Sequence, residues 1–182
     1  MVTPQTIPRT SAPTVTIRRG TRADASLLTT LGATTFRDTY APLTDADDLE
    51  AFIAATFRQD LIAAALDDPQ QCYLVAAVAG EDVGYALLRH GEDGGAGGGP
   101  ALELGLLYVD EPFQGRGVGA ALMAESIAQA RRDGYRILRL TVWEHNARAI
   151  GFYRRWGFRT IGETRFLLGG EEQRDLVMAL GV

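Results

Sequence analysis

The sharpest chemical pattern in the sequence is a glycine-rich turn, Gln114-Gly115-Arg116-Gly117-Val118-Gly119, placed between an expected strand and an expected helix. Three glycines in five residues remove the Cβ atoms that would keep a ligand away from the backbone. The unpaired N–H groups of a helix start and the positive end of its dipole favour a bound anion. The segment therefore predicts a site for a phosphate or pyrophosphate group, to which Arg116 can add positive charge.

Other glycine-rich phosphate motifs fit the turn less well. A Walker loop is excluded because no Gly-Lys-Ser/Thr follows. Gly115, Gly117 and Ala120 satisfy the G-x-G-x-x-A pattern of a dinucleotide-binding oxidoreductase. However, five residues separate the expected strand from Gly115, and the next strand offers no acidic residue at the required distance. That function is disfavoured, and a purely structural glycine turn stays open.

Composition narrows the possible partners. The net charge is −5, and none of the 18 strongly basic residues is a lysine, a balance that disfavours nucleic acid as a partner. Cys72 is the only cysteine, and no Cys/His cluster has zinc spacing, so neither a disulfide nor a metal site is expected. No apolar run approaches the roughly 20 residues of a membrane helix, and no signal peptide is evident. We expect a cytoplasmic protein without membrane contact.

The elements that must position the turn follow from hydrophobic period and from helix and strand breakers. Early hairpins and a late strand–helix–strand–helix unit predict an α/β (α+β mixed) fold with a central mixed sheet covered by helices. Residues 1–13 are expected to be a disordered lead-in to a single domain over residues 14–182, and residues 91–99 a flexible connection within it. The expected strands are residues 15–18, 73–79, 83–89, 102–109, 137–143, 158–163 and 174–180, and the expected helices are residues 24–40, 46–66 with interruptions, 117–132 and a last one from Asn146 to Gly157.

Two patterns together resemble the signature regions of GNAT acetyltransferases. The first, Q/R-x-x-G-x-G/A after a strand that ends near a Tyr-Val pair, is matched by Gln114, Gly117 and Gly119. The second, N-x-x-A-x-x-x-Y-x-x-x-G-F, is matched by Asn146, Ala149, Tyr153, Gly157 and Phe158. The tail from Phe166 to Gly169, with Gln173, Asp175, Leu176 and Met178, is similar to bacterial polyamine (spermidine/spermine) acetyltransferases.

The resemblance implies a mostly antiparallel sheet in which the parallel strands 102–109 and 137–143 splay apart to admit acetyl-CoA. Gly105 is expected to mark the bulge that starts the splay. Backbone groups of the first strand would pair with the pantetheine arm, the amides of the turn would hold the pyrophosphate, and Asn146 would assist. The residues implied to bind the cosubstrate are Leu107, Tyr108, Val109, Gln114, Gly115, Arg116, Gly117, Val118, Gly119, Ala120, Asn146 and Ala149.

The expected chemistry begins with removal of a proton, because an alkyl amine is almost fully protonated at neutral pH and cannot attack a thioester in that form. Glu103 is the candidate base, and strand alternation predicts it on the same side as Gly105 and Leu107. A substrate-orienting role for Glu103 stays open, and His145 is a weaker alternative base. The Leu107 N–H is expected to stabilise the oxyanion. Tyr153 matches the family's general acid, although it also fits an apolar stripe that packs in the core.

The acceptor side is less determined by the sequence. Phe36, Tyr40 and Trp143 could wall an amine pocket or belong to the core. The acidic residues Asp45, Asp47, Asp48 and Glu50 could attract a polycation or begin a solvated helix. The expected function is acetyl transfer from acetyl-CoA to a primary amine, such as a polyamine, by direct attack in a ternary complex. Alternatives are a protein N-terminal or lysine acetyltransferase and a non-catalytic acyl-CoA sensor, and a homodimer is common among similar proteins.

Overall fold

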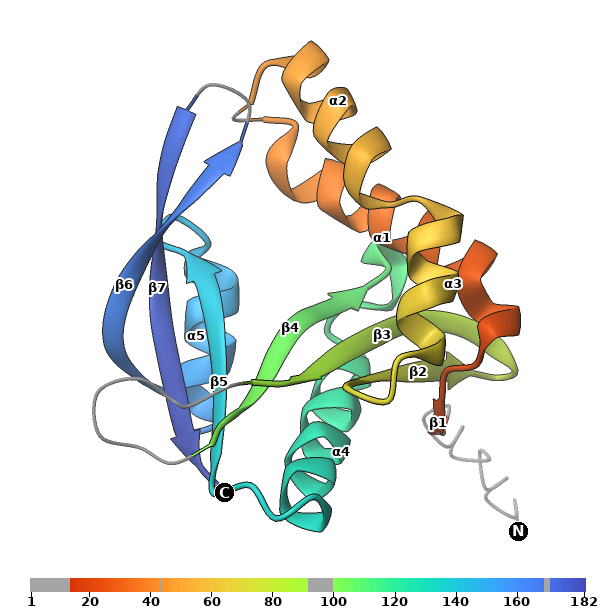
Figure 1. Cartoon of the computed structure of the whole chain (residues 1–182), viewed down its shortest axis with the longest axis vertical. Coiled ribbons are helices and arrows are strands. Elements are labelled where there is room, and N and C mark those ends of the chain that lie inside the picture. Colours follow the sequence, from red (N-terminus) through yellow and green to blue (C-terminus); the bar gives the residue numbers. More distant parts are fainter. Residues whose placement is uncertain (1–13, 43, 92–99, 169–170) are drawn as a thin grey trace, which may run out of the picture.

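The computed structural model describes residues 14–42, 44–91, 100–168 and 171–182. The predicted lead-in, residues 1–13, lies outside the described part, as does nearly all of the predicted glycine-rich connection. Figure 1 shows the arrangement of the elements. Their bounds are β1 Val15–Arg19, η1 Arg22–Asp24, α1 Ala25–Tyr40, α2 Ala46–Thr56, α3 Gln59–Asp67, β2 Gln71–Val78, β3 Glu81–His90, β4 Leu102–Val109, η2 Glu111–Phe113, α4 Val118–Arg132, β5 Ile137–Trp143, α5 Ala147–Arg155, β6 Arg159–Leu168 and β7 Glu171–Gly181.

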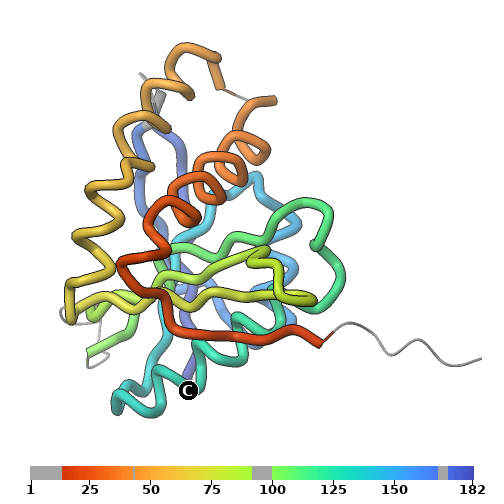
Figure 2. The backbone as a smooth tube through the Cα atoms, turned by 90° about the vertical axis from the view of Figure 1, so that its right-hand side faces the viewer, coloured from red at the N-terminus to blue at the C-terminus, as the bar shows by residue number. Residues whose placement is uncertain are grey.

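The strands form one seven-stranded sheet in the order β1-β2-β3-β4-β5-β7-β6. Every neighbouring pair is antiparallel except β4 and β5, which run parallel. Helices cover both faces of the sheet (Figures 1 and 2). The predicted mixed, mostly antiparallel sheet with one parallel pair is therefore confirmed, and the bounds predicted for β4 and β5 agree with the structure.

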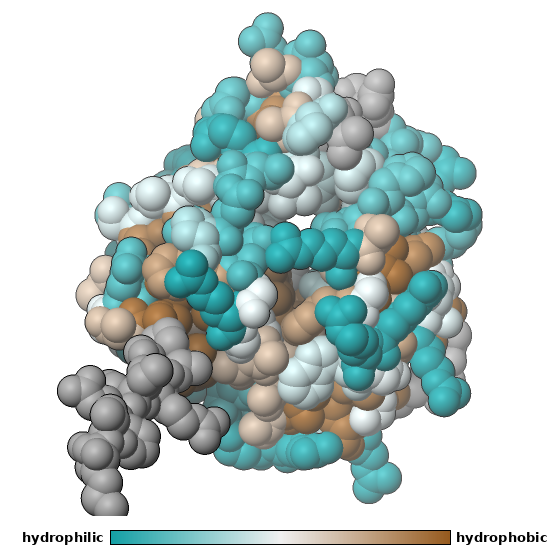
Figure 3. Space-filling view, turned by 180° about the vertical axis from the view of Figure 1, so that it is seen from behind, coloured by the Kyte–Doolittle hydropathy of each residue, from teal (hydrophilic) through white to brown (hydrophobic). Residues whose placement is uncertain are grey.

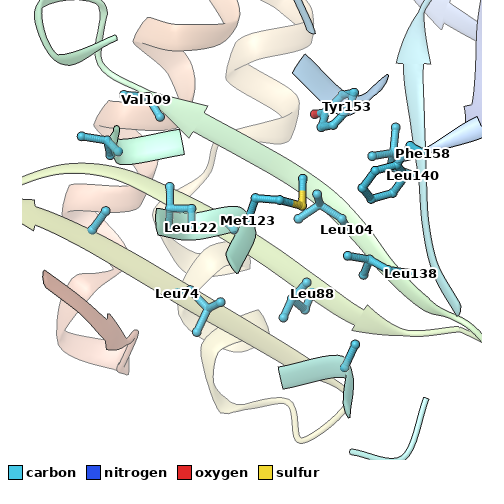
Figure 4. Close-up of a cluster of buried hydrophobic side chains, with 14 of the residues drawn as sticks. Leu74, Leu88, Leu104, Val109, Leu122, Met123, Leu138, Leu140, Tyr153 and Phe158 are labelled. Carbon is cyan, nitrogen blue, oxygen red and sulfur yellow. The ribbon is translucent and has the colours of Figure 1, made fainter. Parts of the chain in front are cut away.

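Two hydrophobic clusters hold the helices to the sheet. One lies under α4 and α5 and includes Leu122, Met123 and Phe158 (Figure 4). The other lies under α1, α2 and α3 and includes Leu28 and Tyr85. Successive side chains of a strand point to opposite faces, so β2 and β3 contribute to both clusters and bind the two helical layers together.

The predicted helix over residues 46–66 is divided into α2 and α3. Phe57 ends α2 with a non-helical backbone (φ −95°, ψ 61°), and Arg58 is extended (φ −97°, ψ 131°). The Phe57 ring is buried and lies 5.7 Å from the ring of Phe36 on α1. The chain turns at Phe57, so its ring is directed inward while both helices stay on the surface.

The last two strands are longer than predicted. The sequence indicates strands over residues 158–163 and 174–180, whereas β6 runs to Leu168 and β7 begins at Glu171. The additional residues are paired across the two strands, from Arg165 with Arg174 to Leu168 with Glu171. Several β6 side chains are exposed, so an alternation of apolar and polar residues could not mark the end of the strand.

None of the helices in the described ranges is both long enough and apolar enough to span a lipid bilayer.

Candidate active site

The site is built around the point where β4 and β5 separate. Across the two strands, whose residues are all described, only Leu102 with Leu138 and Glu103 with Arg139 are paired. In β3, Leu88 pairs with Leu104 and Leu87 pairs with Leu106, so Gly105 is left over as a bulge. The predicted splay and the predicted bulge at Gly105 are both present. A β-bulge bends its strand and increases its twist, which explains why β4 turns away from β5 there.

The bulge also overturns the predicted alternation of side chains along β4. Leu104 and Leu107 both pack in the cluster under α4 and α5, although they are three residues apart. Glu103 lies on the opposite face, where Leu106 packs in the cluster under α1 to α3. The prediction that Glu103 and Leu107 share a side is wrong, because the extra residue at Gly105 reverses the alternation.

Glu103 is held between two arginines. Its Oε1 atom lies 3.6 Å from Arg89 Nη1, and its Oε2 atom lies 4.0 Å from Arg139 Nη2. About a third of the side chain is exposed (34%), and it lines a small cavity together with Thr141 and Thr164. The carboxylate is therefore accessible on the face that carries α1 to α3, beside the closed end of the splay.

The glycine turn presents bare backbone, as the sequence predicts. Gly115 (φ 76°) and Gly117 (φ 88°) have left-handed backbones, and a Cβ atom on either would point into open space. Helix α4 begins directly after Gly117, and no described side chain caps it. The first intrahelical bond runs from Ala121 N to Gly117 O, so the amides of residues 118–120 have no partner within the helix. Such a helix start can bind an anion.

Side chains from two other elements brace this turn. Gln114 Nε2 donates to the Val109 carbonyl at 2.8 Å, and Arg148 on α5 donates to Gln114 Oε1. The Arg116 guanidinium lies 5.6 Å from the centre of the Phe113 ring. Gln114 thus ties the end of β4 to α5. Arg148 was missed by the sequence reasoning, which had only its proximity to Asn146 as a signal.

Figure 3 shows the face of the molecule seen from behind Figure 1. Its middle is hollowed, with apolar atoms deeper inside and hydrophilic side chains around the rim. This mixture of surfaces suits a ligand with an apolar arm and charged groups.

Tyr153 on α5 is 9% exposed and belongs to the cluster under α4 and α5. Figure 4 shows it at the edge of that cluster with its hydroxyl oxygen turned toward β4. Burial, and then the nearby Tyr40 phenol, raise the pKa of Tyr153 to about 12. The hydroxyl therefore stays protonated at neutral pH. Its ring also packs 5.7 Å from that of Phe158, so the predicted packing role is present.

Asn146 caps α5, as predicted, since its Oδ1 accepts a hydrogen bond from Ala149 N at 3.0 Å. Its partner Ala149 packs against the cluster under α4 and α5. In contrast, the imidazole of His145 is 70% exposed and lies 3.9 Å from Glu144, which fits a surface role.

Aromatic side chains gather between α1 and β5. The Tyr40 ring lies 4.4 Å from Phe36 and 5.6 Å from Trp143, measured between ring centres. Phe36 is buried and also stacks on Phe52 at 4.8 Å, so it is mainly a core residue. Tyr40 and Trp143 are thus the two predicted pocket residues that join α1 to the end of β5.

The acidic residues after α1 mostly serve helix α2. The Asp45 side chain accepts hydrogen bonds from Asp47 N at 2.9 Å and Asp48 N at 3.4 Å, which makes it the N-cap. Glu50 is paired with Arg37 at 2.6 Å. The helix-start interpretation is supported by these bonds.

Two strand residues near the aromatic group were given no role by the sequence reasoning. Asp175 and Gln173 on β7 each carry a buried oxygen atom without a hydrogen-bond partner among the described residues. Asp175 is directly opposite Trp143 in the β5–β7 ladder. The sequence singles the two residues out only as part of the tail that resembles polyamine acetyltransferases, because unpaired buried atoms depend on the packing of distant elements.

The chain is similar to known acetyltransferases. Residues 34–158 match the model of the acetyltransferase (GNAT) family. A protein of Mycobacterium tuberculosis named as an N-acetyltransferase is 34% identical over 155 residues, which cover 85% of this chain and 96% of that protein. The spermine/spermidine N(1)-acetyltransferase of Bacillus subtilis is 30% identical over 111 residues, 56% of this chain and 70% of that enzyme.

A solved structure, the PaiA N-acetyltransferase of Thermoplasma acidophilum in complex with coenzyme A, has the same fold. Its TM-score is 0.74 at 18% identity, with 93% of this chain and 99% of that chain covered. The family match extends from within α1 through the splayed strands and the glycine turn to the end of α5, so it includes Glu103, the turn and Tyr153. The chain accordingly belongs to the GNAT family of acetyltransferases.

Proposed function

We propose that this protein transfers the acetyl group of acetyl-CoA to a primary amine by direct attack in a ternary complex, with a small polyamine as the acceptor. The observation that carries the proposal is the separation of β4 from β5 beside a helix start whose first amides have no partner within the helix. The Bacillus spermine/spermidine acetyltransferase among the relatives and the net charge of −5 support a cationic acceptor.

The cosubstrate would be bound mainly by backbone groups. The amides of residues 118–120 would hold the pyrophosphate, with Arg116 and Arg148 adding positive charge nearby. The edge of β4 that β5 leaves unpaired after Glu103 would pair with the pantetheine arm. Gln114, through its hydrogen bond to the Val109 carbonyl, would fix the position of the turn relative to that edge of β4.

Three groups of this chain would carry the chemistry. Glu103 takes one proton from the acceptor ammonium, directly or through water, so that the neutral amine can attack the thioester. The Leu107 N–H donates to the oxyanion that forms. Tyr153 gives its proton to the departing sulfur and regains one from the nitrogen of the new amide. No covalent acyl-enzyme is formed, and the net products are the acetylated amine, free CoA and one proton.

The test is release of free CoA thiol from acetyl-CoA in the presence of four acceptor classes. These are polyamines such as spermidine, amino acids, peptides with a free N-terminus, and peptides with a single lysine. We expect turnover with the polyamines and at least tenfold lower kcat/KM with the others. Preferential turnover of either peptide class would instead make the protein a peptide acetyltransferase. Binding of acetyl-CoA without turnover of any amine would contradict the enzymatic proposal and favour an acyl-CoA sensor.

A further inference from the structure

The inner face of β7 carries an incomplete polar site. Asp175 Oδ1 and Gln173 Oε1 are both buried, and neither meets a donor in the described ranges of the chain. The two residues are two positions apart on one strand, so their side chains point to the same face of the sheet. Buried polar atoms almost always have a partner, and a buried carboxylate without one is especially unfavourable. Two unpaired acceptors on one face are typical of a site in which a ligand supplies the hydrogen-bond donors.

The surroundings of Asp175 suit a cation. Trp143 is its direct cross-strand neighbour, and the Tyr40 ring lies 5.6 Å from that of Trp143. Burial, and then the Asp175 charge, raise the pKa of Tyr40 to about 12. No ion pair joins Asp175 to any residue that the structure describes. Aromatic faces beside a carboxylate attract an ammonium group, by cation–π interaction and by charge.

This site is separate from the proposed base. Glu103 is at the level of Arg139, and Asp175 is at the level of Trp143, four residues farther along β5. At about 3.3 Å per residue, the two levels are roughly 13 Å apart. One ammonium group cannot touch both carboxylates, whereas a long diamine can approach both.

We propose that Asp175, with the Gln173 side-chain oxygen and the rings of Tyr40 and Trp143, binds a second, non-reacting ammonium group of a diamine or polyamine acceptor. The proposal rests on the proposed function, and it assigns to this chain a residue that selects its substrate. A monoamine leaves the site without a cation, while an acceptor with a distal ammonium supplies the donors that Asp175 and Gln173 lack.

The experiment compares two acceptors with the same six-carbon chain, hexylamine and 1,6-diaminohexane, with wild-type protein and Asp175→Asn. Asparagine keeps the shape of the side chain and removes the charge. Glu172→Gln is the matched control, because Glu172 is an exposed residue of the same strand that pairs with Arg165 and not with the site. The quantity measured is the ratio of kcat/KM for the diamine to that for the monoamine.

We expect the wild-type protein and Glu172→Gln to prefer the diamine, and Asp175→Asn to lose about tenfold or more of that preference with an unchanged KM for acetyl-CoA. An unchanged ratio in Asp175→Asn would overturn the proposal, and so would an equal loss for both acceptors. If the wild-type protein acetylates neither these amines nor any other acceptor, the proposed function fails. If it acetylates them without preferring the diamine, only the present inference fails.

Discussion

Tyr153 packs in the core, and in the proposed mechanism the same side chain also donates a proton. Its ring fills the edge of the cluster under α4 and α5, and its hydroxyl faces β4. With a pKa of about 12, the phenol keeps its proton over the whole range in which an acetyltransferase would be assayed. Any fall in rate below about pH 10 must therefore come from another group.

Removing only the hydroxyl separates these two roles. We expect Tyr153→Phe to lower kcat by about a hundredfold, the low end of general acid catalysis, with little change in the thermal midpoint because the ring is retained. Tyr73→Phe makes the same change at a buried phenol in the other cluster and should leave kcat intact. Thiol-release kinetics and thermal unfolding measure both effects. An equal kcat in the two variants would remove Tyr153 from the reaction.

Single residues differed in how far the sequence could determine their environment. Asn146 was predictable as a cap, because capping depends on residues within one turn of the helix. The side of the sheet on which Glu103 lies was not, because one bulged residue at Gly105 reverses the alternation on which such a prediction depends. The unpaired oxygens of Asp175 and Gln173 depend on elements far apart in the chain, so no local pattern contained them.

At the scale of elements, the proposed pyrophosphate site requires the start of α4 to stay free of side chains where the ligand would lie. Gly117→Ala would place a Cβ atom in the path of a bound anion and in a left-handed backbone, at about 1–2 kcal/mol of strain. We expect at least tenfold weaker acetyl-CoA binding by calorimetry. Gly134→Ala is a matched control, since Gly134 has φ 80° and the same open surroundings just after the other end of α4. If Gly117→Ala and Gly134→Ala weaken acetyl-CoA binding equally, backbone strain causes the effect, and access to the amides does not.

The cap of α5 allows a second comparison between elements. Asn146→Ala should lower the free energy of unfolding by about 1 kcal/mol, through loss of the hydrogen bond to Ala149 N. Asp45→Ala removes the equivalent cap of α2 and should have a similar effect. Both are measured by urea unfolding, and acetyl-CoA affinity should fall only for Asn146→Ala. If the affinity falls equally for Asp45→Ala, the effect reflects global stability.

The ends of an element were predicted well where its apolar residues begin and stop at clear positions in the sequence. Strands β4 and β5 are nearly continuous apolar runs in the middle of the sheet, and their predicted bounds are those of the structure. Strands β6 and β7 extend beyond their apolar portions because they pair with each other, which no local pattern reveals. The division of α2 from α3 at Phe57 depends on where that ring finds space beside Phe36.

At the scale of the whole molecule, the absence of lysine makes the alkaline behaviour unusually simple. Arginine stays charged well above pH 12, so tyrosines are the main side chains that lose protons between pH 10 and 12. Burial raises the pKa of Tyr153 from 10 to about 12. Above pH 10 the unfolded chain ionises this phenol while the folded chain does not, so stability present below pH 10 is lost as the pH approaches 12.

We therefore expect the free energy of unfolding to fall steeply above pH 10, with Tyr153 contributing about 2–3 kcal/mol of the loss by pH 12. Urea unfolding at intervals of half a pH unit measures the slope. The free energy of unfolding should fall less steeply with pH in Tyr153→Phe. The difference should correspond to about one proton released on unfolding, because the variant has no phenol to ionise at this position. Identical slopes in the two proteins would show that the Tyr153 phenol titrates normally.

The whole account depends on acetyl-CoA lying between β4 and β5 with its pyrophosphate at the start of α4. The most direct measurement is a crystal structure of the complex with coenzyme A. We expect phosphate oxygens within hydrogen-bond distance, about 2.7–3.2 Å, of the amides of Val118, Gly119 and Ala120, and the pantetheine arm along the unpaired edge of β4. Coenzyme A bound elsewhere on the molecule, with these amides facing solvent, would contradict the account.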